Sequence, residues 1–189
     1  MEFPPGEIRD IIDEIAHILR TKNYTLAVSE AACGGLISAY LISVPGASDF
    51  YIGGKLVYSL KQRLRLSGWS ADEIRHYMGP SEVVALRLAR TTKYELGSTF
   101  VLSETGFAGP TVDLHLTDGG GTGTSAAGAN ASGTTVGASA GPGDVYLGFV
   151  GPDRELSCKR QTHSANRSQN MTEFARFGLE FLLDQLRSL

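Results

Sequence analysis

The stretch that most constrains the fold is residues 25–41, TLAVSEAACGGLISAYL. A short apolar run is followed by a turn of small residues that ends in Gly34-Gly35, and an apolar segment at helical spacing comes next. This order predicts a strand, a glycine turn and a helix. Backbone N–H groups at such a helix start are unpaired and lie at the positive end of the helix dipole, so the turn suits an anion such as phosphate. The alternative is that the glycines only close a tight connection.

Length and charge limit the classes of protein to consider. With 189 residues, 42% of them hydrophobic, the chain can bury one sizeable core, and we expect one domain. The formal net charge of −3 and the absence of a clustered Lys/Arg run argue against a partner that is nucleic acid or a membrane surface. No apolar run approaches the ~20 residues of a membrane span, so we expect a soluble, cytoplasmic protein. The two cysteines, Cys33 and Cys158, are expected to be free thiols.

The rest of the chain alternates between helical and strand patterns. Helices are predicted over residues 8–19, 34–42, 71–77, 81–96 and from Asn166 onward, and strands over residues 26–28, 50–58, 100–103, 145–150 and 155–161. The last two strands are most simply an antiparallel hairpin. The pattern predicts a single α/β domain with a mixed β-sheet flanked by helices.

One segment departs from this pattern. Residues 111–143 are rich in Gly, Ala, Ser and Thr and have almost no large apolar side chains. Such a composition cannot bury enough surface to offset its own ordering entropy. We therefore predict a flexible surface insertion. A glycine-rich phosphate loop is disfavoured because no amphipathic helix follows.

Polar residues follow the strand over 50–58. Ligands in parallel α/β sheets lie beyond the carboxyl ends of strands, so Tyr58, Ser59, Lys61 and Arg63 are candidate site residues. The alternative for the two basic residues is an ordinary solvated helix face.

Two further candidates stand near other element ends. Thr105 follows the strand over 100–103, although turn chemistry explains it equally well. Arg167 lies in the first turn of the last helix, where a cation opposes the dipole; this favours a role in binding an anion.

Several segments in order resemble the CinA carboxy-terminal domain family. They are SEAACGGLISAYLISVPGASDFYIGGKLVYS, the long helix after GPSEVVA, SETGFAGP, and GDVYLGF with Asn-Arg at the start of a terminal helix. The resemblance covers nearly the whole chain apart from residues 111–143. It implies a nicotinamide-nucleotide amidase, which deamidates nicotinamide mononucleotide and releases ammonia. It further implies a small-molecule nucleotide as ligand, no cofactor, no metal, and a homodimer.

The resemblance also implies a set of site residues, located in the turns at 30–35, 46–48, 58–63 and 105–110. The implied catalytic residues are Ser48, Tyr58, Lys61, Arg63 and Cys33. The implied substrate-binding residues are Glu30, Ala31, Gly34, Gly35, Ser59, Thr105, Gly106 and Arg167. We expect the Gly34-Gly35 helix start, Arg63 and Arg167 to converge on one phosphate-sized site.

Four positions depart from the usual family pattern. Ala31 stands where the family has serine, Cys33 where it has threonine, Leu60 where it has asparagine, and Arg63 where it has lysine. Alanine lacks the hydroxyl that could serve amide hydrolysis, and arginine stays protonated at any working pH and cannot act as a base.

These departures leave three hypotheses open. In the first hypothesis, the nucleophile is Ser48 or a water activated near Tyr58, with Lys61 as the basic group. In the second hypothesis, Cys33 is the nucleophile, because a thiol at a helix N-terminus has a lowered pKa. Otherwise the chain is an inactive family member that binds a nucleotide or a partner.

Overall fold

The computed structural model describes residues 2–112 and 140–189. Within these residues, five strands form one mixed sheet in the order β2-β1-β3-β4-β5. Strand β1 pairs in parallel with β2 and β3, and β4 pairs antiparallel with both β3 and β5. The strands are β1 (Leu26–Glu30), β2 (Tyr51–Leu56), β3 (Phe100–Gly106), β4 (Asp144–Val150) and β5 (Glu155–Gln161). The predicted α/β domain with a mixed sheet is confirmed. The predicted insertion falls mostly on residues 113–139, outside the described residues.

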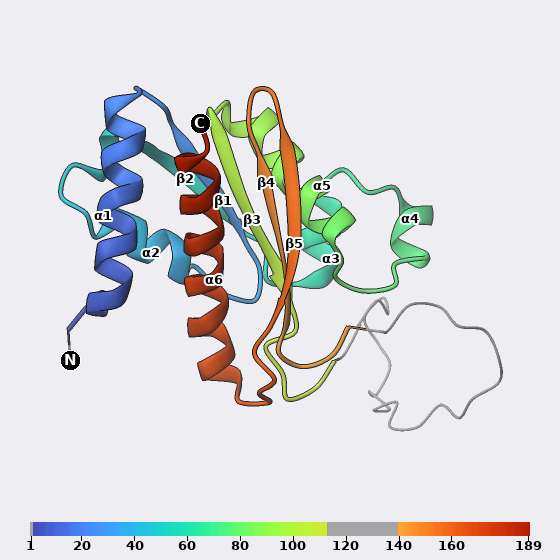
Figure 1. Ribbon diagram of the computed structural model, residues 1–189. Helices are drawn as coiled ribbons and strands as arrows, with labels where there is room; N and C mark the ends of the chain where they lie inside the picture. Colours follow the sequence, from blue (N-terminus) through green and yellow to red (C-terminus); the bar gives the residue numbers. More distant parts are fainter. Residues whose placement is uncertain (1, 113–139) are drawn as a thin grey trace.

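Helices cover both faces of the sheet. The three helices α1, α2 and α6 pack on one face, whereas α5 packs on the other, with α3 and α4 beside it (Figure 1). The helices are α1 (Gly6–Thr21), α2 (Leu36–Ile42), α3 (Leu60–Arg65), α4 (Ala71–Arg75), α5 (Glu82–Leu96) and α6 (Arg167–Arg187), with a short 3₁₀ helix η1 (Ala47–Asp49). No helix in the described ranges is both long enough and apolar enough to span a membrane.

The ends of the long helices follow from local sequence. The Ser81 side chain accepts a hydrogen bond from the Val84 N–H at the start of α5, and Gly97 ends this helix with φ of 68°. The Asn166 side chain caps α6 by accepting from the Gln169 N–H. Each cap satisfies a backbone group that the helix end would otherwise leave unpaired. The predicted limits of these helices are confirmed.

Several strand limits differ from the prediction; β1, for example, runs on to Glu30, and two further differences bear on the site. The strand expected over 100–103 continues to Gly106, because β4 runs antiparallel beside it and pairs Thr105 with Tyr146 and Gly106 with Val145. Thr105 is therefore a strand residue rather than a turn residue. The strand expected over 50–58 ends at Leu56, since the chain turns there toward α3.

The chain order places a crevice at the end of β1. From β1 the chain passes through α2 on one face to β2, and it then returns through α5 on the opposite face to β3, on the other side of β1. The connections therefore diverge at the carboxyl end of β1. Open α/β sheets bind ligands at such a point.

A small apolar cluster supports the segment between β2 and β3. Its buried members are Val57, Leu64, Tyr77, Val84 and Leu88, and we call it the α3–α5 cluster. It is separate from the main core under α1, α2 and α6. The α3–α5 cluster fixes the region where β2 leads into α3.

Gly148 of β4 offers a test of the close packing between the sheet and α5. A Cβ atom at this position would lie 2.6 Å from the Ser103 Oγ and 2.8 Å from the Ala85 carbonyl oxygen. We expect Gly148→Ala to lower the free energy of unfolding by about 1–3 kcal/mol, because α5 must shift. Urea denaturation measures this. The control is Gly6→Ala at the start of α1, where a Cβ meets open space. Equal stability of the two variants would contradict the close packing.

Candidate functional site

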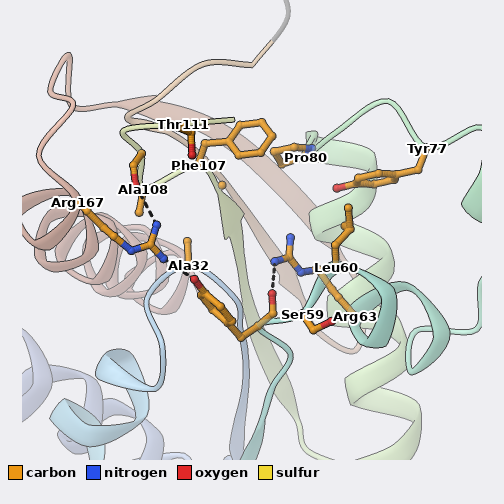
Figure 2. A pocket seen from close by; sticks show the side chains of 13 residues that line it. Ala32, Ser59, Leu60, Arg63, Tyr77, Pro80, Phe107, Ala108, Thr111 and Arg167 are labelled. Atoms are coloured by element: carbon orange, nitrogen blue, oxygen red, sulfur yellow. Dashed lines mark hydrogen bonds between the residues drawn. The ribbon is translucent and has the colours of Figure 1, made fainter. Parts of the chain in front are cut away.

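A cavity of about 370 Å³ opens at the carboxyl edge of the parallel strands. Its walls come from five places in the chain: the turn after β1, the segment after β2, the segment before α5, the end of β3 and the start of α6. The lining residues are Ala32, Tyr58, Ser59, Leu60, Arg63, Tyr77, Pro80, Gly106, Phe107, Ala108, Gly109, Thr111 and Arg167. Figure 2 shows Arg63 and Arg167 on opposite sides of this cavity, with Ala32 between them. The cavity lies at the point where the topology predicts a ligand.

Three N–H groups of the turn after β1 bind a carboxylate of the protein instead of facing this cavity. The N–H groups of Ala31 and Cys33 each donate to the Glu104 Oε2 at 3.0 Å, and that of Ala32 donates to the Glu104 Oε1 at 3.3 Å. Glu104 is fully buried in β3. The expectation that these N–H groups face outward to bind phosphate is therefore wrong, since the anion that they bind is a carboxylate of the protein.

A second carboxylate binds the start of α2. The Glu30 side chain accepts from the N–H groups of Ile37 and Ser38 at 3.0 and 2.8 Å and from the Ser38 hydroxyl. Tyr51 in turn donates to the Ser38 Oγ at 2.7 Å. Glu30 is thus a structural residue that joins β1 to α2.

Cys33 is held in the same buried turn. Its side chain is 1% exposed. Burial raises the pKa of the Cys33 thiol well above its ordinary value, and the charges of Glu104 and Glu30 raise it further. The expectation of a lowered pKa is wrong, because burial, reinforced by the adjacent carboxylates, outweighs any effect of the helix terminus on the Cys33 thiol. A protonated, buried thiol is a poor nucleophile.

Arg63 crosses from α3 to the end of β3. Its Nε donates to the Val57 carbonyl oxygen, its Nη1 to the Thr105 Oγ1 and its Nη2 to the Tyr58 carbonyl oxygen, each at 3.0 Å. The side chain is buried, and all three acceptors are neutral. Burial raises the pKa of Glu104, and the Arg63 charge opposes this shift, as do the N–H groups of the turn.

Arg167 occupies the opposite wall. Its Nη1 donates to the Gly109 carbonyl oxygen at 2.9 Å and its Nη2 to the Tyr58 Oη at 2.7 Å. Its guanidinium carbon lies 5.8 Å from the centre of the Tyr58 ring. Arg167 thus links the start of α6 to the segment after β2, and both side chains stay exposed.

The cavity brings together only part of the predicted site. Among the predicted residues, those that line it are Tyr58, Ser59, Arg63, Gly106 and Arg167. Thr105 lies behind Arg63 and accepts its hydrogen bond. The predicted residues that do not line it are Ser48, Lys61, Cys33, Glu30, Ala31, Gly34 and Gly35. Of the elements expected to converge, Arg63 and Arg167 share the cavity and the Gly34-Gly35 helix start does not.

Sequence reasoning missed the lining residues Tyr77 and Pro80, which lie outside the predicted turns, whereas Phe107 lies in the predicted turn at 105–110. Tyr77 and Pro80 follow α4, where the chain folds back over Arg63, and no local pattern announces that contact. The Gly79-Pro80 break was visible in the sequence only as the end of a helix.

The lining residues favour binding of an anion over acid–base chemistry. Among the described residues, the lining includes two arginines and no carboxylate, histidine or lysine. The remaining polar groups are hydroxyls and backbone groups. In the described part of the chain, no cluster of His, Cys, Asp and Glu side chains could hold a metal ion.

These features define an α/β domain with a positively charged cavity at the switch point of its sheet. The model of the CinA C-terminal domain matches residues 8–136. The chain therefore belongs to the CinA C-terminal domain family.

The relatives support this assignment. The chain is 38% identical to a CinA-like protein of Myxococcus xanthus over 51% of its own length and 23% of the relative's length. It is 31% identical to a CinA-like protein of a Nostoc species over 76% of its own length and 28% of the relative's. The chain thus spans about a quarter of the length of these curated relatives.

Solved structures share the fold. The competence/damage inducible protein CihA from Agrobacterium tumefaciens superposes with a TM-score of 0.78 at 22% identity over 99% of both chains. A CinA superfamily protein from Klebsiella pneumoniae superposes with a TM-score of 0.76 at 14% identity over 96% of this chain and 99% of its own.

The burial of Cys33 predicts how the thiols react. In the folded protein we expect Ellman's reagent to label only the half-buried Cys158, whereas both thiols react after unfolding. Absorbance of the released thionitrobenzoate counts the labelled thiols. Folded Cys158→Ser protein should show no labelling; rapid labelling of that variant would mean that Cys33 is accessible.

The Glu104 carboxylate is expected to stabilise the turn after β1. Glu104→Gln replaces one acceptor oxygen by a donor that faces backbone N–H groups, so we expect a loss of about 2–3 kcal/mol in the free energy of unfolding. Chemical denaturation measures the loss. The control, Glu155→Gln, removes the exposed pair with Arg90 and should cost about 0–1 kcal/mol. A Glu104→Gln loss no larger than that of the control would contradict a structural role for Glu104.

Proposed function

We propose that this chain is a nicotinamide-nucleotide amidohydrolase-like protein, which binds the mononucleotide in the cavity and deamidates it slowly. One observation carries the proposal: two arginines, Arg63 and Arg167, line the same cavity and no carboxylate lines it. The nicotinamide part of the proposal comes from the resemblance in sequence to this class of amidase.

The charge of the cavity favours a nucleotide monophosphate. A phosphate monoester carries between one and two negative charges near neutral pH, and guanidinium groups bind its oxygens with strong, directed hydrogen bonds. Both arginines are positioned by neutral protein acceptors, namely the Val57, Tyr58 and Gly109 carbonyls and two hydroxyls. No carboxylate accepts a hydrogen bond from either arginine in the described residues, although the buried Glu104 lies close enough to interact with the Arg63 charge.

The same inventory argues for slow chemistry. Amide hydrolysis needs an activated nucleophile or water and a proton for the leaving ammonia. Cys33 is buried and protonated, Ala31 has no hydroxyl, and Ser48 lies exposed on η1 away from the cavity. What remains at the cavity are hydroxyls such as those of Tyr58 and Ser59, which can orient a water but have no base among the lining residues.

The second candidate is a nucleotide-binding family member without catalysis. The observation that favours it is this lack of a base or an activated nucleophile among the residues that line the cavity. Both candidates require binding of the mononucleotide, and they differ only in release of ammonia.

Binding and turnover are measured separately. We expect calorimetry to detect binding of nicotinamide mononucleotide, and a coupled glutamate dehydrogenase assay to detect ammonia at a rate at least about 100-fold below the ~10 s⁻¹ typical of enzymes. Arg167→Ala should weaken binding about tenfold or more, because a charge-assisted contact is lost. The control is Arg90→Ala on the surface of α5.

The outcomes separate the candidates. Absence of binding would overturn both. Binding without detectable ammonia would leave the non-catalytic candidate. Fast release of ammonia would show that the cavity recruits a catalytic group that its described lining does not contain.

A further inference from the structure

Tyr77 presents a buried hydroxyl to the cavity. Its side chain is 6% exposed, and its hydroxyl forms no regular hydrogen bond within the described residues. Among the buried side-chain atoms that lack a partner there, this hydroxyl is the one whose residue lines the cavity. Figure 2 shows the hydroxyl pointing from the α4 side toward the space beside Arg63. An unpaired buried hydroxyl is unfavourable, so a ligand that supplies an acceptor there binds favourably.

The hydroxyl acts as a donor. Burial raises the pKa of Tyr77 to about 12, against the opposing effect of the neighbouring Arg63 charge. The phenol therefore keeps its proton at neutral pH. The neighbouring Arg63 can only donate hydrogen bonds. The phenol proton therefore has no acceptor among the described residues, and a ligand can supply one.

Arg63 has unused donors in the same place. A guanidinium carries five N–H groups, and three of them bind Val57, Thr105 and Tyr58. The other two N–H groups form no hydrogen bond of regular geometry within the described residues, although the guanidinium lies close enough to the Tyr77 hydroxyl to oppose the rise in its pKa. The Arg63 side chain is 8% exposed and lines the cavity. Arg63 and Tyr77 thus offer hydrogen-bond donors and a positive charge at one buried place. No carboxylate among the described lining residues faces them.

We propose that Arg63 and Tyr77 form an anion subsite that binds the phosphate group of the mononucleotide. This rests on the proposed function, because it assigns one end of that ligand. Phosphate oxygens accept several hydrogen bonds and carry the charge that a buried guanidinium favours. The carboxamide is a weaker match, since it is neutral and its pyridinium ring carries a positive charge that Arg63 repels.

The subsite is held rigid by its surroundings. The Tyr77 ring packs in the α3–α5 cluster and meets the Trp69 ring edge to face, with ring centres 5.7 Å apart. Arg63 is fixed by its three acceptors. Donors that need no rearrangement bind a ligand with little loss of entropy. The Tyr77 ring therefore stabilises the cluster, whereas its hydroxyl, which forms no regular hydrogen bond within the described residues, is left to select for phosphate.

Tyr77→Phe tests the subsite, because it removes the hydroxyl and keeps the ring. We expect the dissociation constant for nicotinamide mononucleotide to rise about tenfold or more. Binding of nicotinamide riboside, which lacks the phosphate, should be weak in the wild type and unchanged by the substitution. The Tm of the unliganded variant should equal or exceed that of the wild type, since no protein contact is lost. The control is Tyr94→Phe, at a side chain that is 92% exposed on α5.

Calorimetry with nicotinamide mononucleotide, nicotinamide riboside, adenosine monophosphate and inorganic phosphate decides the result. An equal loss of affinity for riboside and mononucleotide in Tyr77→Phe would place the carboxamide there and overturn the subsite. An unchanged dissociation constant, or no binding of any phosphate-bearing probe, would overturn it as well. Binding that depends on Tyr77 for adenosine monophosphate or phosphate but not for nicotinamide mononucleotide would support the subsite and overturn the proposed function. Tyr77-dependent binding without ammonia release supports the subsite and rejects only turnover.

Discussion

The hydrogen bonds from the turn after β1 to the Glu104 carboxylate are the contact on which the site depends. They join β1 to β3 at the edge where the cavity opens, and they consume the three N–H groups that a phosphate-binding turn would offer. A fully buried carboxylate that accepts these bonds fixes the backbone of Ala32, which lines the cavity. Backbone N–H groups that bind anions in other folds here donate to a carboxylate of the protein. A ligand would therefore be recognised by side chains from the opposite walls of the cavity.

Arg63, at the position where the sequence resemblance implies a lysine, has a structural role that a lysine could not fill. The planar fork of a guanidinium reaches three acceptors at once, two of them backbone carbonyls of the segment after β2 and the third on β3. A lysine ammonium, with one nitrogen, could not serve these separated acceptors. Arg63 therefore anchors the segment at 57–63 to the sheet. The same substitution removes a group that could act as a base, so the gain in anchoring coincides with a loss in chemistry.

The sequence predicted the elements better than the site, and the reason is distance along the chain. Helix ends at Ser81, Gly97 and Asn166 depend on residues within one turn, and these predictions are confirmed. The Glu104 contacts join residues more than 70 positions apart, and that of Arg167 with Tyr58 spans 109. Thr105 looked like a turn residue because its partner strand β4 lies beyond the segment 113–139. No local periodicity carries such information.

The two arginines also constrain how a ligand can lie in the cavity. Arg63 is buried and Arg167 is exposed. Desolvation and low dielectric strengthen the attraction between Arg63 and an anion, whereas solvent screens Arg167. A nucleotide with a negative phosphate and a cationic ring would therefore be most stable with its phosphate toward Arg63. Its ring would then lie toward the solvent-exposed wall formed by Tyr58 and Arg167. In that orientation, which our proposal predicts, the amide would lie away from Arg63, where the described lining offers no base. Binding of the nucleotide and slow hydrolysis would then follow from the same arrangement of charge.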